Sequence, residues 1–195
     1  MTEPDLEVTH NALAGQTDGH GRRTRLREFQ AQLVERMHAA ASGTAQQANQ
    51  LGIMVGQERW LLNLQEAGEI VSVGNITPVP LTQPWFLGLT NIRGNLVSVV
   101  DFAGFCGLPA TPVDKESRIV AFAPALAFNG GLLVSRVLGL RNVTEMEPHA
   151  DAAAELAAEE APWAARRYVD RESRIWTELN LSLIVQDPRF MQVGL

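Results

Sequence analysis

Apolar residues alternate with polar or small residues on both sides of Arg93-Gly94-Asn95, within residues 84–108. This alternation predicts two antiparallel strands joined by a tight turn at Gly94, because Gly next to Asn tolerates the positive φ of such a turn. The second strand is expected to end at Asp101, where a short turn at residues 103–107 leads to Pro109.

Other short segments show the composition of strands, with turn signals at close intervals between them. The predicted strands are residues 51–56, 59–65, 117–124, 131–140, 166–170 and 174–179. Residues 66–73 are predicted to form a short turn or half-helix, and residues 181–186 a short helix. Many short strands with little helix between them indicate an all-β barrel or sandwich with minor helices rather than a parallel sheet.

The N-terminal part differs from the rest. Residues 1–21 are polar and without periodicity, so we expect a disordered tail. Residues 22–41 carry Leu26, Phe29, Leu33 and Met37 at spacings of three and four, which predicts an amphipathic helix. A small-residue linker at residues 42–50 then leads to a domain spanning residues 51–195.

An acidic, alanine-rich insert occupies residues 145–162, with six carboxylate residues and no Lys or Arg. Alanine and glutamate favour helix, but Leu156 is its main candidate for an apolar face. We therefore interpret it as a solvated helix or mobile loop between strands, in preference to a dedicated docking segment.

Composition limits the function further. The net charge of −6 argues against nucleic acid or an anionic membrane surface as the main partner. The longest apolar run, residues 119–128, is too short to span a bilayer, and the first residues lack a secretory signal. The single cysteine, Cys106, cannot form an internal disulfide, which is typical of a reducing compartment. We expect a cytoplasmic protein without direct membrane insertion.

The chemistry of an enzyme is missing. Cys106 has no histidine near it in sequence, no histidine pair has metal-ligand spacing, and Lys115 lies in a polar loop. Asp101 lacks the acidic cluster of a phospho-acceptor site, so it is interpreted as a turn-capping carboxylate. Nucleotide-binding and nucleophile-elbow motifs are also absent. We expect no catalytic residues, no metal site and no cofactor. From chemistry alone, Arg93 at the hairpin tip either faces water or contacts a partner.

The pattern PxFLGLxNIRGNxxSVVDFxxFxGLP resembles the signature of the CheW family, adaptors that couple chemoreceptors to a histidine kinase. The resemblance covers residues 51–143 and, more loosely, 164–190. It implies two small SH3-like five-stranded β-barrels around a shared core, here preceded by the N-terminal helix. One barrel of the family binds the regulatory domain of a CheA-like kinase, and the groove between barrels takes the cytoplasmic tip of a methyl-accepting chemoreceptor.

The resemblance also implies site residues. The family has an acidic residue ahead of an Ile that forms a surface ion pair with the arginine of N-x-R-G; Glu69 and Arg93 occupy these places. Glu69, Asn91, Arg93 and Gly94 would thus lie near the receptor groove. Ser135 stands where the family usually has Asp, which leaves a charged contact there open.

The flanking segments are most similar to the CheW-like adaptors of chemosensory systems that control type IV pilus twitching motility. This similarity implies association with receptor arrays at the membrane. Two alternatives remain open. An SH3-like barrel module that binds peptides or a small ligand outside chemotaxis would use the same apolar grooves. An enzyme of an unrecognised type would have a deep pocket lined by convergent polar groups, for which the sequence supplies few candidates.

Overall fold

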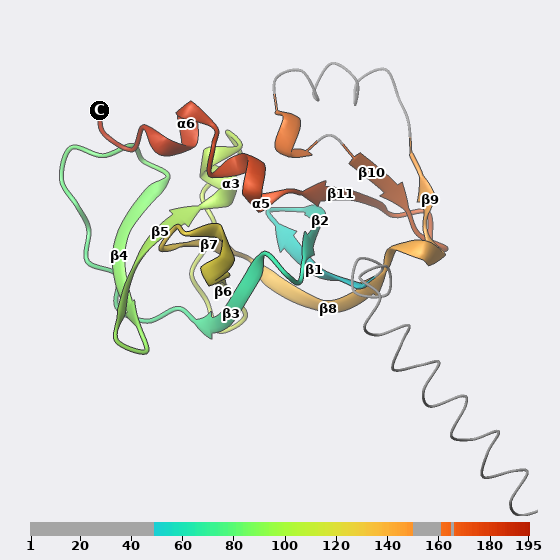
Figure 1. Cartoon of the computed structure of the whole chain (residues 1–195), viewed down its shortest axis with the longest axis horizontal. Coiled ribbons are helices and arrows are strands. Elements are labelled where there is room, and N and C mark those ends of the chain that lie inside the picture. The colour runs from blue at the N-terminus through green and yellow to red at the C-terminus, as the bar shows by residue number, and fades with distance from the viewer. Residues whose placement is uncertain (1–48, 150–160, 165) are drawn as a thin grey trace, which may run out of the picture. The chain divides into compact units, whose positions relative to one another are not determined.

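The computed structural model describes residues 49–149, 161–164 and 166–195 (Figure 1). The predicted disordered tail, the predicted helix at 22–41 and most of the linker lie outside the described residues, as does most of the acidic insert. The first strand begins at Asn49, two residues before the expected start of the domain.

One sheet has six strands, which are β1 (Asn49–Val55), β2 (Glu58–Asn63), β8 (Arg136–Asn142), β9 (Glu147–Pro148), β10 (Arg166–Val169) and β11 (Ile175–Leu179). Their order is β8-β1-β2-β11-β10-β9. Neighbouring strands are antiparallel except β11 and β2, which run parallel. The two-residue β9 lies at the beginning of the predicted acidic insert, where no strand was predicted.

The other sheet has five strands, which are β3 (Ala67–Ser72), β4 (Phe86–Ile92), β5 (Asn95–Asp101), β6 (Arg118–Phe122) and β7 (Gly130–Val134). Their order is β3-β6-β7-β5-β4, so β3 and β4 are the two outer strands. The predicted all-β class with two small β subdomains is confirmed, with six strands rather than five in one of them. The predicted central hairpin is confirmed as β4 and β5.

The prediction of one strand at residues 131–140 is wrong. The chain leaves the five-stranded sheet after Val134 and enters the six-stranded sheet at Arg136. Ser135 lies at the crossing, where its backbone N–H donates to the carbonyl of Met54 at 3.0 Å. All residues of β7 are buried whereas β8 is partly exposed, so the change of sheet coincides with the change from apolar to mixed sequence.

The prediction of a turn or half-helix at residues 66–73 is also wrong, because these residues contain β3. The register of β3 against β6 shifts between Ala67 and Ile70. Gly68 lies within this irregularity, where a Cβ would be 2.8 Å from the carbonyl oxygen of Phe122. Glu69 is therefore a strand residue.

Short helices connect and follow the strands. α3 (Phe102–Phe105) stands where a turn was expected, and α5 (Leu181–Ile184) confirms the predicted C-terminal helix. α6 (Pro188–Met191) was not predicted. The described residues also contain three 3-10 helices, which are η1 (Pro124–Leu126), η2 (Val143–Glu145) and η3 (Pro162–Ala164). Among the described residues, no helix has the length and apolar character needed to cross a membrane.

The two sheets share one apolar core. Leu51, Ile53 and Leu62 of the six-stranded sheet pack in the same buried cluster as Val100 and Leu132 of the five-stranded sheet. Fully burying one such side chain contributes about 1.5–3 kcal/mol. The cluster also contains large aromatic side chains, which are Trp60, Phe102, Trp163 and Phe190. This shared core holds the five-stranded sheet and its hairpin in a fixed place on the six-stranded sheet.

Candidate partner-binding site

The turn between β4 and β5 explains two of the four candidate residues. Its two central residues, Arg93 and Gly94, have φ angles of 51° and 89°, as a two-residue turn of the primed type requires. The Asn91 side chain accepts a hydrogen bond from the Gly94 backbone N–H at 2.8 Å. Asn91 and Gly94 therefore shape the turn, whatever else they contact.

The FLG part of the motif has a structural cause as well. Gly88 has φ 127°, and a Cβ there would lie 2.1 Å from the carbonyl oxygen of Thr77. Thr77 and Leu89 exchange two backbone hydrogen bonds of 2.8 and 2.9 Å beside it. This close approach of backbones needs glycine, and it fixes the extended segment before β4 against the hairpin.

The ion pair implied by the resemblance is present. Arg93 Nη2 lies 2.7 Å from Glu69 Oε1. Glu69 is on edge strand β3, whereas Arg93 follows edge strand β4. The pair therefore connects the two edges of the five-stranded sheet (Figure 1). The Arg93 side chain is 80% exposed and that of Glu69 is 32% exposed. A pair this exposed contributes only about 0–1 kcal/mol to stability.

Arg93 itself is not required by the turn. A non-glycine residue at positive φ costs about 1 kcal/mol, and Gly or Asn fits the position better. Among the described residues, the arginine side chain forms no hydrogen bond or ion pair within its own hairpin, and its ion pair is with Glu69. Its charge is thus on the surface at some cost to the backbone conformation, and the exposed ion pair returns little stability.

Cys106 and Asp101 have structural roles. Burial, together with the nearby carboxylates Glu58 and Asp101, raises the pKa of Cys106 to about 12, so its thiol is neutral at physiological pH. Asp101 is buried and accepts hydrogen bonds from Thr111 N at 2.9 Å and Thr111 Oγ1 at 2.7 Å. It fixes the loop after α3; it was expected to cap a turn, yet its side chain makes no cap bond to α3.

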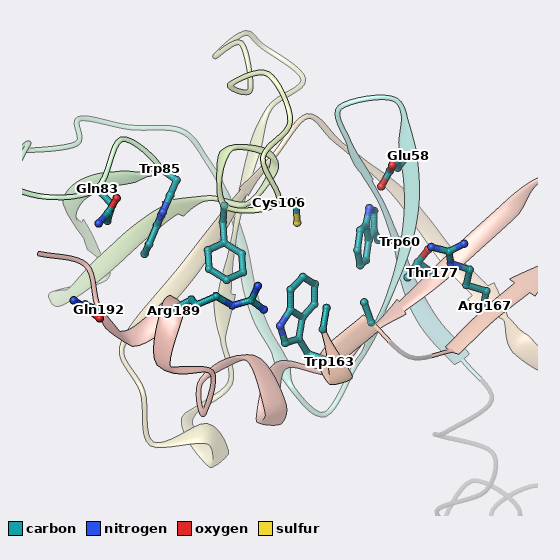
Figure 2. Close-up of a pocket in the computed structure, with 13 residues that line it drawn as sticks. Glu58, Trp60, Gln83, Trp85, Cys106, Trp163, Arg167, Thr177, Arg189 and Gln192 are labelled. Carbon is teal, nitrogen blue, oxygen red and sulfur yellow. The ribbon is translucent and has the colours of Figure 1, made fainter. Parts of the chain in front are cut away.

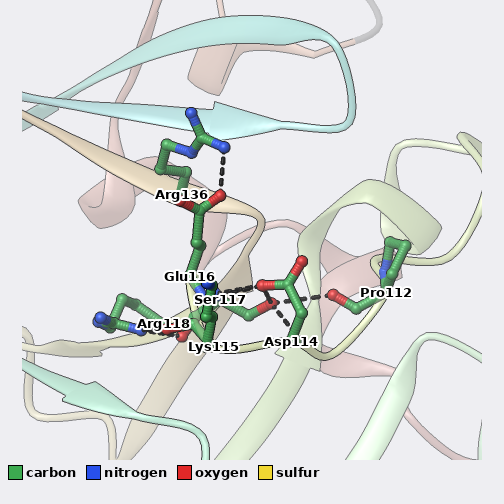
Figure 3. Close-up of polar contacts among 7 residues, drawn as sticks. All are labelled: Pro112, Asp114, Lys115, Glu116, Ser117, Arg118 and Arg136. Carbon is green, nitrogen blue, oxygen red and sulfur yellow. Dashed lines mark hydrogen bonds and ion pairs between the residues drawn. The ribbon is translucent and has the colours of Figure 1, made fainter.

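The polar loop at residues 112–118 contains Lys115 and holds its own shape (Figure 3). Asp114 accepts from the backbone N–H groups of Glu116 and Ser117, and these hydrogen bonds lower its pKa. Glu116 forms an ion pair with Arg136 of β8. Lys115 contributes its carbonyl, which accepts from Arg118. In the part of the chain that the structure describes, no group of three His, Cys, Asp or Glu side chains could hold a metal.

An aromatic cleft of about 590 Å³ next to the shared core was not predicted from the sequence (Figure 2). Trp60, Trp85, Phe105 and Trp163 line it, with Cys106 at its wall. Trp60 and Trp163 stack with their ring centroids 6.2 Å apart. These residues come from distant parts of the sequence, so no local pattern connects them; the number of tryptophans was the one available signal.

A family model for the CheW-like domain matches residues 50–189. PilI of Pseudomonas aeruginosa is 28% identical over 92 residues, which are 47% of this chain and 51% of PilI. The chemotaxis protein CheW of Helicobacter pylori is 31% identical over 91 residues, which are 44% of this chain and 55% of that protein. The chain thus spans about half the length of these relatives.

A solved structure has the same fold. The scaffolding protein TtCheW of Thermoanaerobacter tengcongensis superposes with a TM-score of 0.55 at 20% sequence identity, covering 69% of this chain and 84% of TtCheW. The resemblance carried by the hairpin motif is therefore confirmed by the family match and by the fold. The chain belongs to the CheW-like domain family, a family of scaffolds and adaptors rather than enzymes.

Proposed function

We propose that this chain is a non-enzymatic adaptor that couples a methyl-accepting chemoreceptor to a CheA-like histidine kinase. The family match over residues 50–189 supports an adaptor role. The observation that carries the proposal is the exposed Glu69–Arg93 pair, held at 2.7 Å across the five-stranded sheet. A charge pair displayed on a rigid sheet provides orientation and partner choice more than folding energy.

The four candidate residues have different roles in the proposed site. Arg93 presents the charge, and Glu69 keeps its guanidinium over β3. Asn91 and Gly94 set the turn from which Arg93 projects. A carboxylate on the partner surface would compete with Glu69 for the Arg93 guanidinium. A partner surface that carries both a carboxylate and a cation could instead bind Arg93 and Glu69 together. Arginine suits this role because its planar group donates along two directions at once.

The proposed pathway is the chemosensory control of type IV pilus twitching motility, with the protein cytoplasmic and held in receptor arrays at the membrane. The match to PilI supports this pathway. Expression of the chain in Pseudomonas aeruginosa lacking PilI should restore twitching zones on agar. Restored swimming in a strain lacking CheW, without restored twitching, would assign the chain to a flagellar pathway instead.

A capture experiment with the full chain as bait tests the adaptor role. A CheA-like kinase and a methyl-accepting receptor should be retained from lysate. Arg93→Glu should lower their recovery about tenfold, because the introduced carboxylate would face the carboxylate of the partner surface. Glu69→Arg combined with Arg93→Glu should restore part of it. Arg171→Glu is the matched control, since Arg171 is also 80% exposed in an ion pair, with Glu145, at another hairpin.

Equal recovery with the Arg93 and Arg171 variants would contradict the assigned site. Recovery of neither protein, at bait concentrations above transient affinities, would instead favour the peptide-binding module.

A further inference from the structure

A second candidate surface lies on the six-stranded sheet, in a cleft of about 780 Å³. Its floor follows from the strand register: Met54 is opposite both Arg59 and Arg136, and Trp176 is beside Arg59. Residues in register on neighbouring strands project to the same face. We call this surface the arginine cleft, defined by Arg59, Arg136, Arg141, Arg174 and Trp176.

The arginines of the cleft differ in whether they have an ion-pair partner. Arg136 is paired with Glu116 (Figure 3), and Arg174 is paired with Asp170 and Glu172. The Arg59 side chain has no hydrogen-bond or ion-pair partner among residues 49–149, 161–164 and 166–195. Among the acidic residues of the cleft, Asp114 accepts hydrogen bonds from backbone N–H groups of its own loop.

The remaining carboxylate, Glu58, also lines the aromatic cleft and lies next to Trp60 there (Figure 2). Consecutive strand residues project to opposite faces, so Glu58 and Arg59 do not share one side of β2. The positive charge of Arg59 in the arginine cleft is therefore left without a matching carboxylate.

The Arg141 guanidinium is held in place and has a donor group available for a hydrogen-bond acceptor. Its guanidinium carbon lies 5.3 Å from the ring centroid of Trp176, which is cation–π geometry. Gly52 makes this possible, because a Cβ there would lie 3.0 Å from Trp176 and 3.1 Å from Arg141. Arg141 Nη2 donates to the Leu138 carbonyl at 3.2 Å, whereas its buried Nε has no acceptor among the described residues.

We propose that the arginine cleft binds an acidic linear segment of a partner protein. One carboxylate of that segment binds beside Trp176, between Arg59 and Arg141, and neighbouring apolar side chains pack on Leu138 and Leu108 of the cleft wall. Charge complementarity carries this choice of occupant: Arg59 and Arg141 have no carboxylate partner among the described residues, and they line a hollow that also contains apolar side chains. A short segment with one carboxylate meets only the cations of this cleft, whereas a membrane or nucleic acid surface would present many negative charges to a chain whose net charge is −6.

The proposal does not depend on Glu69 and Arg93, which lie on the other sheet. Its test uses the full ¹⁵N-labelled chain titrated with an acetylated, amidated peptide of alternating Glu and Leu, seven residues long. The readout is the indole N–H signal of Trp176, assigned by its loss in Trp176→Phe. We expect the Glu peptide to shift this signal and the matching Gln peptide to leave it unchanged.

Single variants locate the contact. Arg59→Ala and Arg141→Ala should each raise the Kd about tenfold, because each removes a charge-assisted hydrogen bond. Arg59→Lys, which keeps the charge, should retain most of the affinity. Arg171→Ala, in an exposed ion pair outside the cleft, is the control and should leave the Kd unchanged. Arg59 supports no buried neighbour by a bond of its own, so its variants test binding even where Arg141→Ala disturbs the packing on Trp176.

Four results would each overturn the proposal. The Glu and Gln peptides could bind equally, or neither could bind at millimolar concentration. Both arginine variants could bind as the parent chain does. Vesicles containing phosphatidylserine could shift the Trp176 signal while the Glu peptide does not, which would assign the cleft to a lipid surface.

Discussion

Two hairpins of this protein are built alike at their turns. In each, an Asn or Asp side chain at the end of the first strand accepts backbone N–H groups of the turn. Asn91 accepts from Gly94 at 2.8 Å in the β4–β5 hairpin. Asp170 accepts from Glu172 at 2.9 Å and from Arg174 at 3.0 Å between β10 and β11. Each turn also contains a non-glycine residue at positive φ.

The arginines of the two hairpins differ. Arg174 folds back so that its Nε donates to Asp170 at 2.8 Å, and the same carboxylate accepts from the buried Trp176 indole at 2.9 Å. Arg93 instead leaves its hairpin to meet Glu69 on another strand. A shielded carboxylate that unites turn, arginine and tryptophan stabilises the fold, whereas an outward arginine costs the fold little and is available to a partner.

The largest expected loss of stability comes from a substitution that disrupts the backbone contact supporting the β4–β5 hairpin. Gly88→Ala should lower the free energy of unfolding by about 3 kcal/mol or more, because the added Cβ overlaps the Thr77 carbonyl and the backbone has positive φ. Urea unfolding followed by circular dichroism measures it. Gly194→Ala, at a site with open space around the glycine, is the control. A loss below about 1 kcal/mol would show that the two segments separate easily.

The carboxylate of the second hairpin should come next. Asp170→Ala should cost about 2–4 kcal/mol, since it leaves the buried Trp176 indole N–H and two backbone N–H groups without their acceptor. Asp170→Asn, which keeps an acceptor of similar size, should cost less. The same unfolding measurement applies. Equal losses for both variants would mean that charge, rather than hydrogen bonding, makes the contribution.

Lowering the pH sharpens the same comparison, because Asp170 titrates and Asn91 does not. Burial alone would raise the pKa of Asp170, but hydrogen bonds from Trp176 and Arg174 outweigh it and hold the pKa well below its usual range. Hydrogen bonds from Arg189 similarly lower the pKa of Asp187 to about 2. A carboxyl whose pKa is lowered by folding stabilises the native state above its unfolded pKa and loses this effect as the pH falls.

The stability advantage of the parent chain over Asp170→Asn should therefore shrink as the pH falls from about 5 toward 2. Unfolding in urea at pH 7, 4 and 3 measures this trend. A difference that stays constant over the range would show that Asp170 titrates normally in the native state.

Local pattern was enough to predict the first hairpin but not the elements that support it. Alternation around Gly94 predicts β4 and β5 because the turn lies within one short segment. β3 was missed because Gly68 and the bulge beside it interrupt the alternation. α6 was missed because the predicted C-terminal helix ended at residue 186 and no element was predicted after it, although Asp followed by Pro, here Asp187-Pro188, is typical of the start of a helix.

The candidate sites show the same limit. Glu69 and Arg93 could be paired only through the family resemblance, because their contact depends on how the outer strands of one sheet approach each other. The Trp176–Arg141 contact depends on space left by Gly52 on a third strand. Such contacts between distant segments are set by strand order and register, which no local period encodes.

Removing the side chain that closes the first turn should have a modest effect. Asn91→Ala should lower the free energy of unfolding by about 0.5–1.5 kcal/mol, because one exposed hydrogen bond to the Gly94 backbone is lost. Asn91→Asp retains an acceptor and serves as the control in the same urea titration. A loss as large as that of Asp170→Ala would remove the distinction between the two turns.

The smallest effect concerns the ion pair itself. A double-mutant cycle of Glu69→Ala and Arg93→Ala should give a coupling of about 0–1 kcal/mol, and added salt should reduce it, because both side chains are reached by solvent. The unfolding free energies of the four chains at low and high salt provide the measurement. A coupling above about 2 kcal/mol that persists in salt would make the pair structural, and the loss of partner capture in Arg93→Glu would then report damage to the sheet rather than a lost contact.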